Sequence, residues 1–207
     1  ISDATRQRRA DLYPQKEGDL TETKACLERF ATRAWRRPVS AAEIDRYFKL
    51  LQTELAAGEK FRSAYLAALT GVLTSKNFYY VVEGDSAKRR AKVNDWELAT
   101  RLSYFLWSSM PDEELSALAD SGRLLEGPVL QKQFERMLDD SKSDRFIKEF
   151  CGQWLDLEGV DRVAINPAVF KNFDNRLKSD MVGETQAFFK EILRSDTSSL
   201  QFIDADF

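Results

Sequence analysis

The chain has 207 residues, of which 43% are hydrophobic, 31% charged and 12% aromatic, a composition typical of a soluble globular protein with one large or two small domains. It contains no histidine, which excludes Ser-His-Asp and Cys-His catalysis, imidazole zinc sites and His-ligated haem. The formal net charge of −3 gives no general attraction to nucleic acid or to an anionic membrane, so neither is expected as a partner.

Two capping motifs predict the first two helices. Asp19 to Glu22 offers a cap with a glutamate three residues on, and apolar residues recur at helical spacing until Arg37-Pro38 ends the helix. Ser40 to Glu43 is a second capping box, whose helix ends near Gly58. Glycine and proline number only 9 and 5, and nearly all lie between helix-period segments, which favours an all-helical chain.

The middle of the chain predicts two more helices with a break between them. Helical spacing continues through Phe61 to Leu73, and the apolar run Phe78 to Val82 follows. Because a lone strand has no partner, this run is expected to be a buried extended link. Glu83 to Lys92 is the best candidate for a mobile loop between two subdomains. Asn94 to Glu97 then caps a helix that ends before Met110-Pro111.

The second half predicts four further helices. A short helix starts at Pro111, the next opens at Gly127-Pro128, and another surrounds Phe146 to Leu155. An irregular segment from Val160 to Phe173 precedes a long helix from Asp174 to Arg194. We therefore expect an all-α fold of about seven or eight helices in two packed helical parts, with little or no sheet.

The inward-facing positions of these helices predict the core, and a Trp154→Ala change is expected to cost about 3 to 5 kcal/mol as a large-to-small core substitution. The expected core residues are Leu27, Phe30, Phe48, Leu51, Leu69, Leu102, Phe105, Leu106, Phe134, Phe150, Trp154 and Phe188.

The two cysteines, Cys26 and Cys151, lie too far apart in the sequence for a CxxC metal site, redox pair or haem attachment motif. No metal site and no cofactor are therefore expected in this chain. Each cysteine lies within an expected helix, where a free thiol packs as a small apolar group. The alternative is a disulfide, which an exported protein would permit if the Cα atoms came within about 7 Å.

No apolar run approaches the roughly 18 to 20 residues that span a bilayer, so no membrane span is expected. The polar start, Ile1 to Arg9, has no following apolar stretch and carries no visible export signal. Because the chain begins with Ile rather than Met, we expect a processed fragment whose targeting signal lay upstream.

Four stretches carry a family resemblance: FATRAWRRPV at residues 30–39, LATRLSYFLWSSMPDEEL at 98–115, FCGQWL at 150–155 and ETQAFF at 184–189. Together they resemble a bacterial family of unknown-function domains found in large secreted proteins, chiefly of planctomycetes and their relatives. Those proteins also carry c-type cytochrome domains. The second stretch is the most specific of the four.

The resemblance implies two modules, a helical one at residues 1–83 with the Arg-Arg-Pro stretch and a larger one at 94–207, joined by a linker at 84–93. It implies that the larger module continues beyond Phe207 and that the protein is periplasmic or secreted. Since the chain lacks CxxCH, any electron-transfer role belongs to other modules. The family has no catalytic residues to carry over, and the expected partners are neighbouring domains of the same polypeptide.

Two clusters are candidates for binding. Arg33, Arg36 and Arg37, with Arg29, lie beside Trp35 and could bind an anion or a sulfated polysaccharide; alternatively, they only complement the dipole at a helix C-terminus. Aromatic residues form the second cluster, which would be a surface for a sugar or a cytochrome; alternatively, helical spacing places them in the core. These residues are Trp96, Tyr104 and Trp107.

Two groups of carboxylates are candidates for acid-base work on a glycoside, namely Asp112 with Glu113 and Glu114, and Glu184 with Asp180. Helix capping explains the first group equally well. Whether this fragment is an enzyme is left open, with a non-enzyme favoured.

The leading functional hypothesis is a non-catalytic interaction or scaffolding module of a large exported multidomain protein with cytochrome c modules elsewhere. The alternative is a fragment of a polysaccharide-acting enzyme that uses carboxylates. Near the end, Leu200, Phe202, Ile203 and Phe207 are apolar but too few to form a stable helix alone. We therefore expect an exposed apolar patch beside the long helix, and self-association through it.

Overall fold

The computed structural model describes residues 12–84, 90–166 and 168–205. The described part of the chain contains ten α-helices, eight of them with seven or more residues, and no strand, which confirms the all-α prediction. The chain divides into two compact units, residues 1–100 and 101–207. The predictions that fall on the Ile1–Arg9 start, on residues 85–89 of the expected linker and on Phe207 lie outside the described residues.

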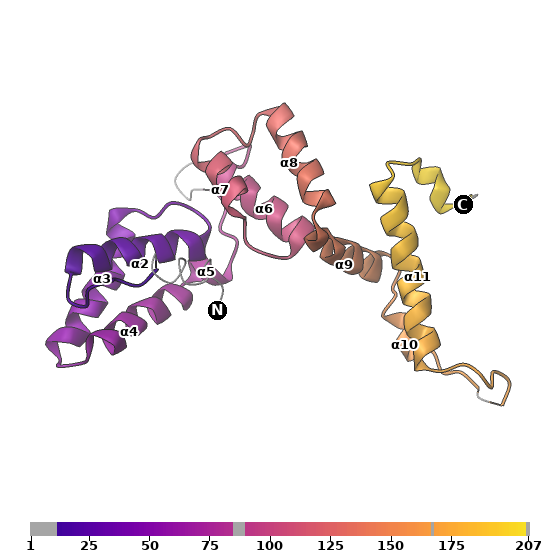
Figure 1. The fold of residues 1–207 in the computed structure, drawn as a ribbon, viewed down its shortest axis with the longest axis horizontal. Helices are drawn as coiled ribbons and strands as arrows, with labels where there is room; N and C mark the ends of the chain where they lie inside the picture. The colour runs from indigo at the N-terminus through magenta and orange to yellow at the C-terminus, as the bar shows by residue number, and fades with distance from the viewer. Residues whose placement is uncertain (1–11, 85–89, 167, 206–207) are drawn as a thin grey trace. The chain divides into compact units, whose positions relative to one another are not determined.

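Helices α2 (Leu20–Trp35), α3 (Ala41–Ala56) and α4 (Phe61–Leu73) pack against one another in the first unit (Figure 1). Their facing sides bury one apolar cluster that includes Leu27, Ile44, Leu51, Tyr65 and Val72. Because burial of such side chains is worth about 1.5 to 3 kcal/mol each, this cluster is the main source of stability for the unit.

The expected caps form as predicted at α2 and α3. The carboxylate of Asp19 accepts hydrogen bonds from the backbone N–H groups of Thr21 and Glu22, and Ser40 and Glu43 form a complete capping box. The predicted contact of the Glu22 side chain with the backbone of Asp19 is replaced by another: the Glu22 carboxylate accepts a hydrogen bond from the backbone N–H of Gln15. The local signal therefore located both helix starts correctly.

The prediction of a buried extended link at 78–82 is wrong. Ser75 caps a four-residue helix, α5 (Lys76–Tyr79), which includes the start of that run. Tyr80 follows in an extended conformation, and the side chains from Tyr79 to Val82 are exposed. A helix this short has too few residues for a periodic pattern, which is why the sequence did not reveal it.

Helix α6 (Asp95–Trp107) contains the boundary between the units, and α7 (Glu113–Asp120) and α8 (Gly127–Asp139) follow it. Pro128 lies in the first turn of α8, as predicted, whereas Pro111 precedes the N-cap of α7, which is Asp112. Buried side chains in this part of the second unit include Leu106, Trp107, Leu115, Leu124 and Met137.

The rest of the second unit consists of η1 (Ser141–Ser143), α9 (Asp144–Trp154), α10 (Gly159–Arg162), α11 (Asn175–Arg194) and η2 (Ser199–Phe202). Helix α9 packs on α11, and η2 packs on α11 as well. The short helix α10 lies within the segment that was expected to be irregular. The buried cluster here is small and consists of Ile147, Cys151 and Phe189.

Several core predictions hold and several are wrong. Leu27, Leu51 and Leu106 are fully buried, and Leu102 nearly so; Phe30, Phe48, Leu69 and Phe188 are partly buried. Four aromatic residues are instead exposed, because the described elements cover their side chains only in part: Phe105, Phe134, Phe150 and Trp154. The predicted loss of stability for Trp154→Ala assumed that Trp154 is a core residue, and this assumption is wrong.

Both cysteines are buried, one in each unit, and neither is in a disulfide. This agrees with packing as small apolar groups and not with the alternative of a disulfide. Within the described residues, no helix is long and apolar enough to cross a membrane.

Candidate functional site

Arg36, at the end of α2, joins this helix to α5. It is the C-cap of α2, adopts a left-handed conformation with φ of 58°, and is buried. Its Nη2 atom donates hydrogen bonds to the carbonyl oxygens of Asn77 (3.1 Å), Phe78 (3.2 Å) and Tyr80 (3.2 Å). Carbonyls at a helix C-terminus lack intrahelical partners, and this guanidinium supplies them. Arg36 is thus a clamp between two segments of backbone.

Arg37, the next residue, is held by Glu43. Its Nη2 atom lies 2.7 Å from Oε1 of Glu43 and its Nη1 atom 3.2 Å from Oε2, while the guanidinium lies over the ring of Trp35 at 5.4 Å. These hydrogen bonds from Arg37, together with those from Ser40, lower the pKa of Glu43 to about 2 although burial opposes the shift. The pair is therefore fully ionised at neutral pH.

A groove opens beside this pair between α3, α5 and the segment that follows α5. We call it the Trp35 groove; its volume is about 1130 Å³. Its wall includes Trp35, Arg37, Arg46, Tyr47 and Lys76. Gly71 allows the ring of Tyr47 to pack closely, since a Cβ atom there would lie 3.1 Å from the ring. The groove therefore combines cations, aromatic rings and polar groups on one surface.

A smaller cavity of about 300 Å³, the Glu97 pocket, shares Trp35 and Arg37 with the groove and also includes Arg36 and Trp96. The structure thus brings two of the three predicted anion-binding arginines next to one of the three predicted surface aromatics. The third arginine, Arg33, is exposed on α2 and lies outside the walls of both cavities.

Glu97 organises the Glu97 pocket. Its carboxylate accepts hydrogen bonds from the backbone N–H groups of Gly84 (2.8 Å) and Asn94 (2.8 Å) and from Nη2 of Arg90 (2.6 Å). Burial alone would raise the pKa of Glu97, but these hydrogen bonds outweigh it and hold the pKa below its usual value. Glu97 therefore joins Gly84 and Arg90 to the start of α6.

The sequence predicted Glu97 only as a helix cap, and the capping box with Asn94 is indeed present. Its bonds to Gly84 and Arg90 carry no sequence signal, because no local motif connects either residue with Glu97. The cations Arg46 and Lys76 were missed for the same reason, since each lies alone among ordinary helix-surface residues.

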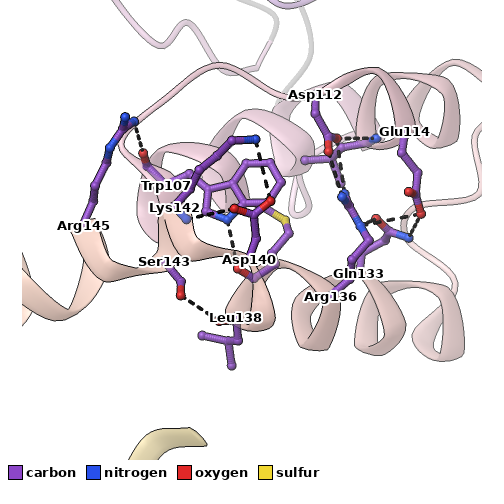
Figure 2. A network of polar contacts seen from close by, with 12 residues as sticks. Trp107, Asp112, Glu114, Gln133, Arg136, Leu138, Asp140, Lys142, Ser143 and Arg145 are labelled. Atoms are coloured by element: carbon purple, nitrogen blue, oxygen red, sulfur yellow. Dashed lines mark hydrogen bonds and ion pairs between the residues drawn. The ribbon is translucent and has the colours of Figure 1, made fainter. Parts of the chain in front are cut away.

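Trp107 belongs to the core of the second unit and not to an exposed aromatic surface (Figure 2). It is 1% exposed, and its Nε1 atom donates to the carbonyl of Met137 at 2.9 Å. The ammonium of Lys142 lies 4.2 Å from the ring centroid, and the guanidinium of Arg136 lies 5.5 Å from it. The core alternative is therefore right for Trp107, whereas Tyr104 is exposed.

The predicted carboxylate Asp112 has a structural environment (Figure 2). It caps α7 by accepting from the N–H of Leu115 (2.9 Å), and both its oxygens accept from Arg136 at 2.8 and 3.2 Å. Burial would raise the pKa of Asp112, but these bonds lower it overall. A general acid needs the opposite shift, so Asp112 has the electrostatics of a capping ion pair.

The other predicted carboxylates occupy two places in the second unit. Glu114 accepts a hydrogen bond from Nε2 of Gln133 at 2.8 Å and joins the network around Arg136 (Figure 2). Glu113 is exposed on α7, while Asp180 and Glu184 are exposed on α11. Among the described residues, no group of three or more cysteines, aspartates and glutamates is placed to hold a metal ion.

A row of aromatic rings on the second unit, which we call the aromatic face, includes Phe105, Phe150 and Trp154, which the sequence predicted to lie in the core. Phe105 contacts Phe146 (4.8 Å between ring centroids), Phe146 contacts Phe150 (5.4 Å), and Phe150 contacts Trp154 (5.6 Å). Trp154 also meets Phe202 of η2 at 5.8 Å. Phe105, Phe150 and Trp154 are 56%, 40% and 54% exposed. The row therefore presents aromatic surface to solvent.

Two family profiles match the chain. Residues 22–83 match PSD5, described as a protein of unknown function (DUF1595), and residues 93–207 match PSD4, described as a protein of unknown function (DUF1592). No curated protein and no solved structure matches the chain. Since the PSD4 profile covers more than half of the chain, the chain belongs to the PSD4 family of proteins of unknown function (DUF1592), with a PSD5 (DUF1595) region preceding that domain.

Proposed function

We propose that this chain is a non-catalytic interaction module of a large exported multidomain protein. The observation that carries the proposal is the aromatic face, where Phe105, Phe150 and Trp154 are each two-fifths exposed or more although their rings form one continuous row. Contiguous apolar surface of this kind marks interaction sites in globular proteins. Tryptophan in particular is enriched among the residues that dominate binding energy at interfaces.

The geometry of α9 explains how the face remains open while the helix stays folded. Ile147 and Cys151 are buried on α9 and pack with Phe189 of α11. Phe150 and Trp154 also contact the ring of Phe189, at 5.4 and 6.4 Å between ring centroids, but remain partly exposed. The buried contacts hold the helix in place and leave the exposed parts of these two rings available. A partner could therefore dock without rearranging the core of this unit.

The occupant in this proposal is a neighbouring domain of the same polypeptide. Two family regions already follow one another in this chain, which supports an architecture of serial modules. A tethered domain reaches effective concentrations in the millimolar range, so even a modest apolar contact would be occupied. The resemblance supports a planctomycete-type protein that also carries c-type cytochrome modules and a periplasmic or secreted location.

The test is calorimetry of the longer polypeptide, in which docking through the aromatic face couples the unfolding of this module to that of its neighbour. A Phe150→Ser/Trp154→Ser variant should separate the two transitions. The control variant, Val169→Ser/Phe170→Ser, removes exposed apolar residues outside the face and should leave them coupled. Unfolding that is uncoupled in the wild type, or equally affected by both variants, would contradict the proposal.

The alternative hypothesis, that the chain is part of a polysaccharide-acting enzyme, is tested separately. Turnover of polysaccharide by the full-length protein that is lost in Glu113→Gln or Glu184→Gln would overturn the non-catalytic proposal. Both residues are exposed, so these changes should leave the fold intact. We expect no carboxylate-dependent turnover.

A further inference from the structure

The Trp35 groove lies in the first unit and is a site of a different kind from the aromatic face of the second unit. Its floor is rigid. The Nε1 atom of Trp35 donates to the carbonyl of Val72 at 3.2 Å, and Arg37 is fixed by two hydrogen bonds to Glu43 and by its position over the Trp35 ring. Because these groups are already ordered, a ligand would not have to order them.

Two cations on the wall are available to a ligand. Arg46 on α3 and Lys76 on α5 both line the groove and are exposed, and neither side chain has a hydrogen-bond or ion-pair partner among the described residues. By contrast, the Glu43 carboxylate on the same wall is occupied by Arg37 and Ser40. Glu83 is the other acidic residue of the wall, so the cations outnumber the carboxylates.

Charges of this kind select oxyanions. The guanidinium of arginine matches the two oxygens of a carboxylate or sulfate, and lysine adds a mobile point charge. Since Arg46 and Lys76 come from different helices, they favour a ligand that carries more than one anionic group over a single small ion.

The rest of the wall is suited to sugar rings. Thr74, Ser75 and Asn77 supply polar groups for hydroxyls, and Tyr47 supplies a half-buried aromatic ring. The groove volume of about 1130 Å³ is large compared with a lone ion and slightly above the range of about 300 to 1,000 Å³ typical of ligand pockets. We infer that the Trp35 groove binds an acidic carbohydrate whose carboxylate or sulfate groups contact Arg46 and Lys76.

The experiment is titration calorimetry of the whole chain with three probes: a sulfated dextran oligosaccharide, an oligogalacturonate and a neutral dextran oligosaccharide. We expect at least one acidic probe to bind and the neutral one not to bind. Arg46→Gln and Lys76→Gln should each weaken binding about tenfold or more, as expected for charge-assisted hydrogen bonds. The two acidic probes distinguish sulfate from carboxylate recognition.

Arg33→Gln is the matched control, because it removes one exposed positive charge outside the groove wall. It should change the affinity less than twofold, and all three variants should keep the wild-type melting temperature. If Arg33→Gln lowered the affinity as much as the groove variants do, general charge attraction would explain the loss, and the proposal would be overturned. In a separate titration with inorganic sulfate, binding as tight as that of the acidic oligosaccharides would also overturn the proposal, as would binding of neither acidic probe.

Discussion

The Nη2 atom of Arg36 lies 3.2 Å from the carbonyl oxygen of Tyr80, which is 44 residues further along the chain. The residue that ends α2 therefore also satisfies the carbonyl groups at the end of α5. This contact fixes one edge of the Glu97 pocket, which Arg36 and Val81 both line. The apparent basic cluster at the end of α2 is thus divided between a buried clamp and an open groove.

Removal of the Arg36 clamp should destabilise the protein measurably. Arg36→Ala should lower the free energy of unfolding by about 2 kcal/mol, since hydrogen bonds to a charged group contribute about 1.5 to 3 kcal/mol and the carbonyls lose their donor. Arg36→Lys should recover only part of this, because an ammonium lacks the planar fork. Urea unfolding is the measurement. A loss below about 0.5 kcal/mol for Arg36→Ala would show that solvent replaces the clamp without cost.

Stability at acid pH should depend on Glu43. Its pKa is lowered to about 2 in the folded protein, so its ion pair with Arg37 contributes fully above pH 4.5 and is lost as the pH falls towards 2. Glu43→Gln should therefore cost about 1 kcal/mol at pH 7, a modest figure because the side chain is about a third exposed. In urea unfolding at several pH values, the difference should vanish near pH 2. A pH-independent difference would contradict this account.

Asp112 and Arg136 should be energetically coupled. Asp112→Asn retains a good N-cap for α7 but loses the ion pair, whereas Arg136→Met loses the ion pair but retains apolar length. A double-mutant cycle should give a coupling energy of about 1 kcal/mol, as expected for a partly exposed, bidentate pair. Additive single effects would mean that capping alone accounts for Asp112.

The two tryptophans of the second unit should differ strongly in their contribution to stability. Trp107→Ala should cost about 3 to 5 kcal/mol, since it empties a buried site and removes the donor to Met137. Trp154→Ala should cost less than about 1.5 kcal/mol, because the ring is half exposed and loses only its partial contacts with Phe150, Phe189 and Phe202. Thermal unfolding of the two variants is sufficient to compare them. Equal costs would mean that Trp154 is covered in solution.

Helix positions could be predicted where a local signal specifies them. Asp19, Ser40 and Asp174 each cap a helix within three residues of their own position, so the sequence contains the whole interaction. Helices α5 and α10 have four residues each and leave no periodic pattern to detect.

The core and the candidate sites were harder to predict because they depend on distant contacts. The spacing of Phe146, Phe150 and Trp154 defines an apolar stripe on α9, but the sequence does not reveal which edge of the stripe another helix covers. In the same way, Arg36 and Arg37 are neighbours in the sequence, yet one contacts Asn77 and the other contacts Glu43. The candidate groove could therefore be predicted only as a group of arginines beside Trp35.

The central claim, that the aromatic face docks a neighbouring domain, is tested most directly by acrylamide quenching of Trp154 fluorescence. Of the four tryptophans, Trp35 and Trp107 are buried and Trp96 is half-buried, so Trp154 supplies most of the quenchable signal, and Trp154→Phe identifies its share. We expect Trp154 to be quenched in this chain alone and protected in the longer polypeptide. Equal quenching of Trp154 in both would contradict the claim.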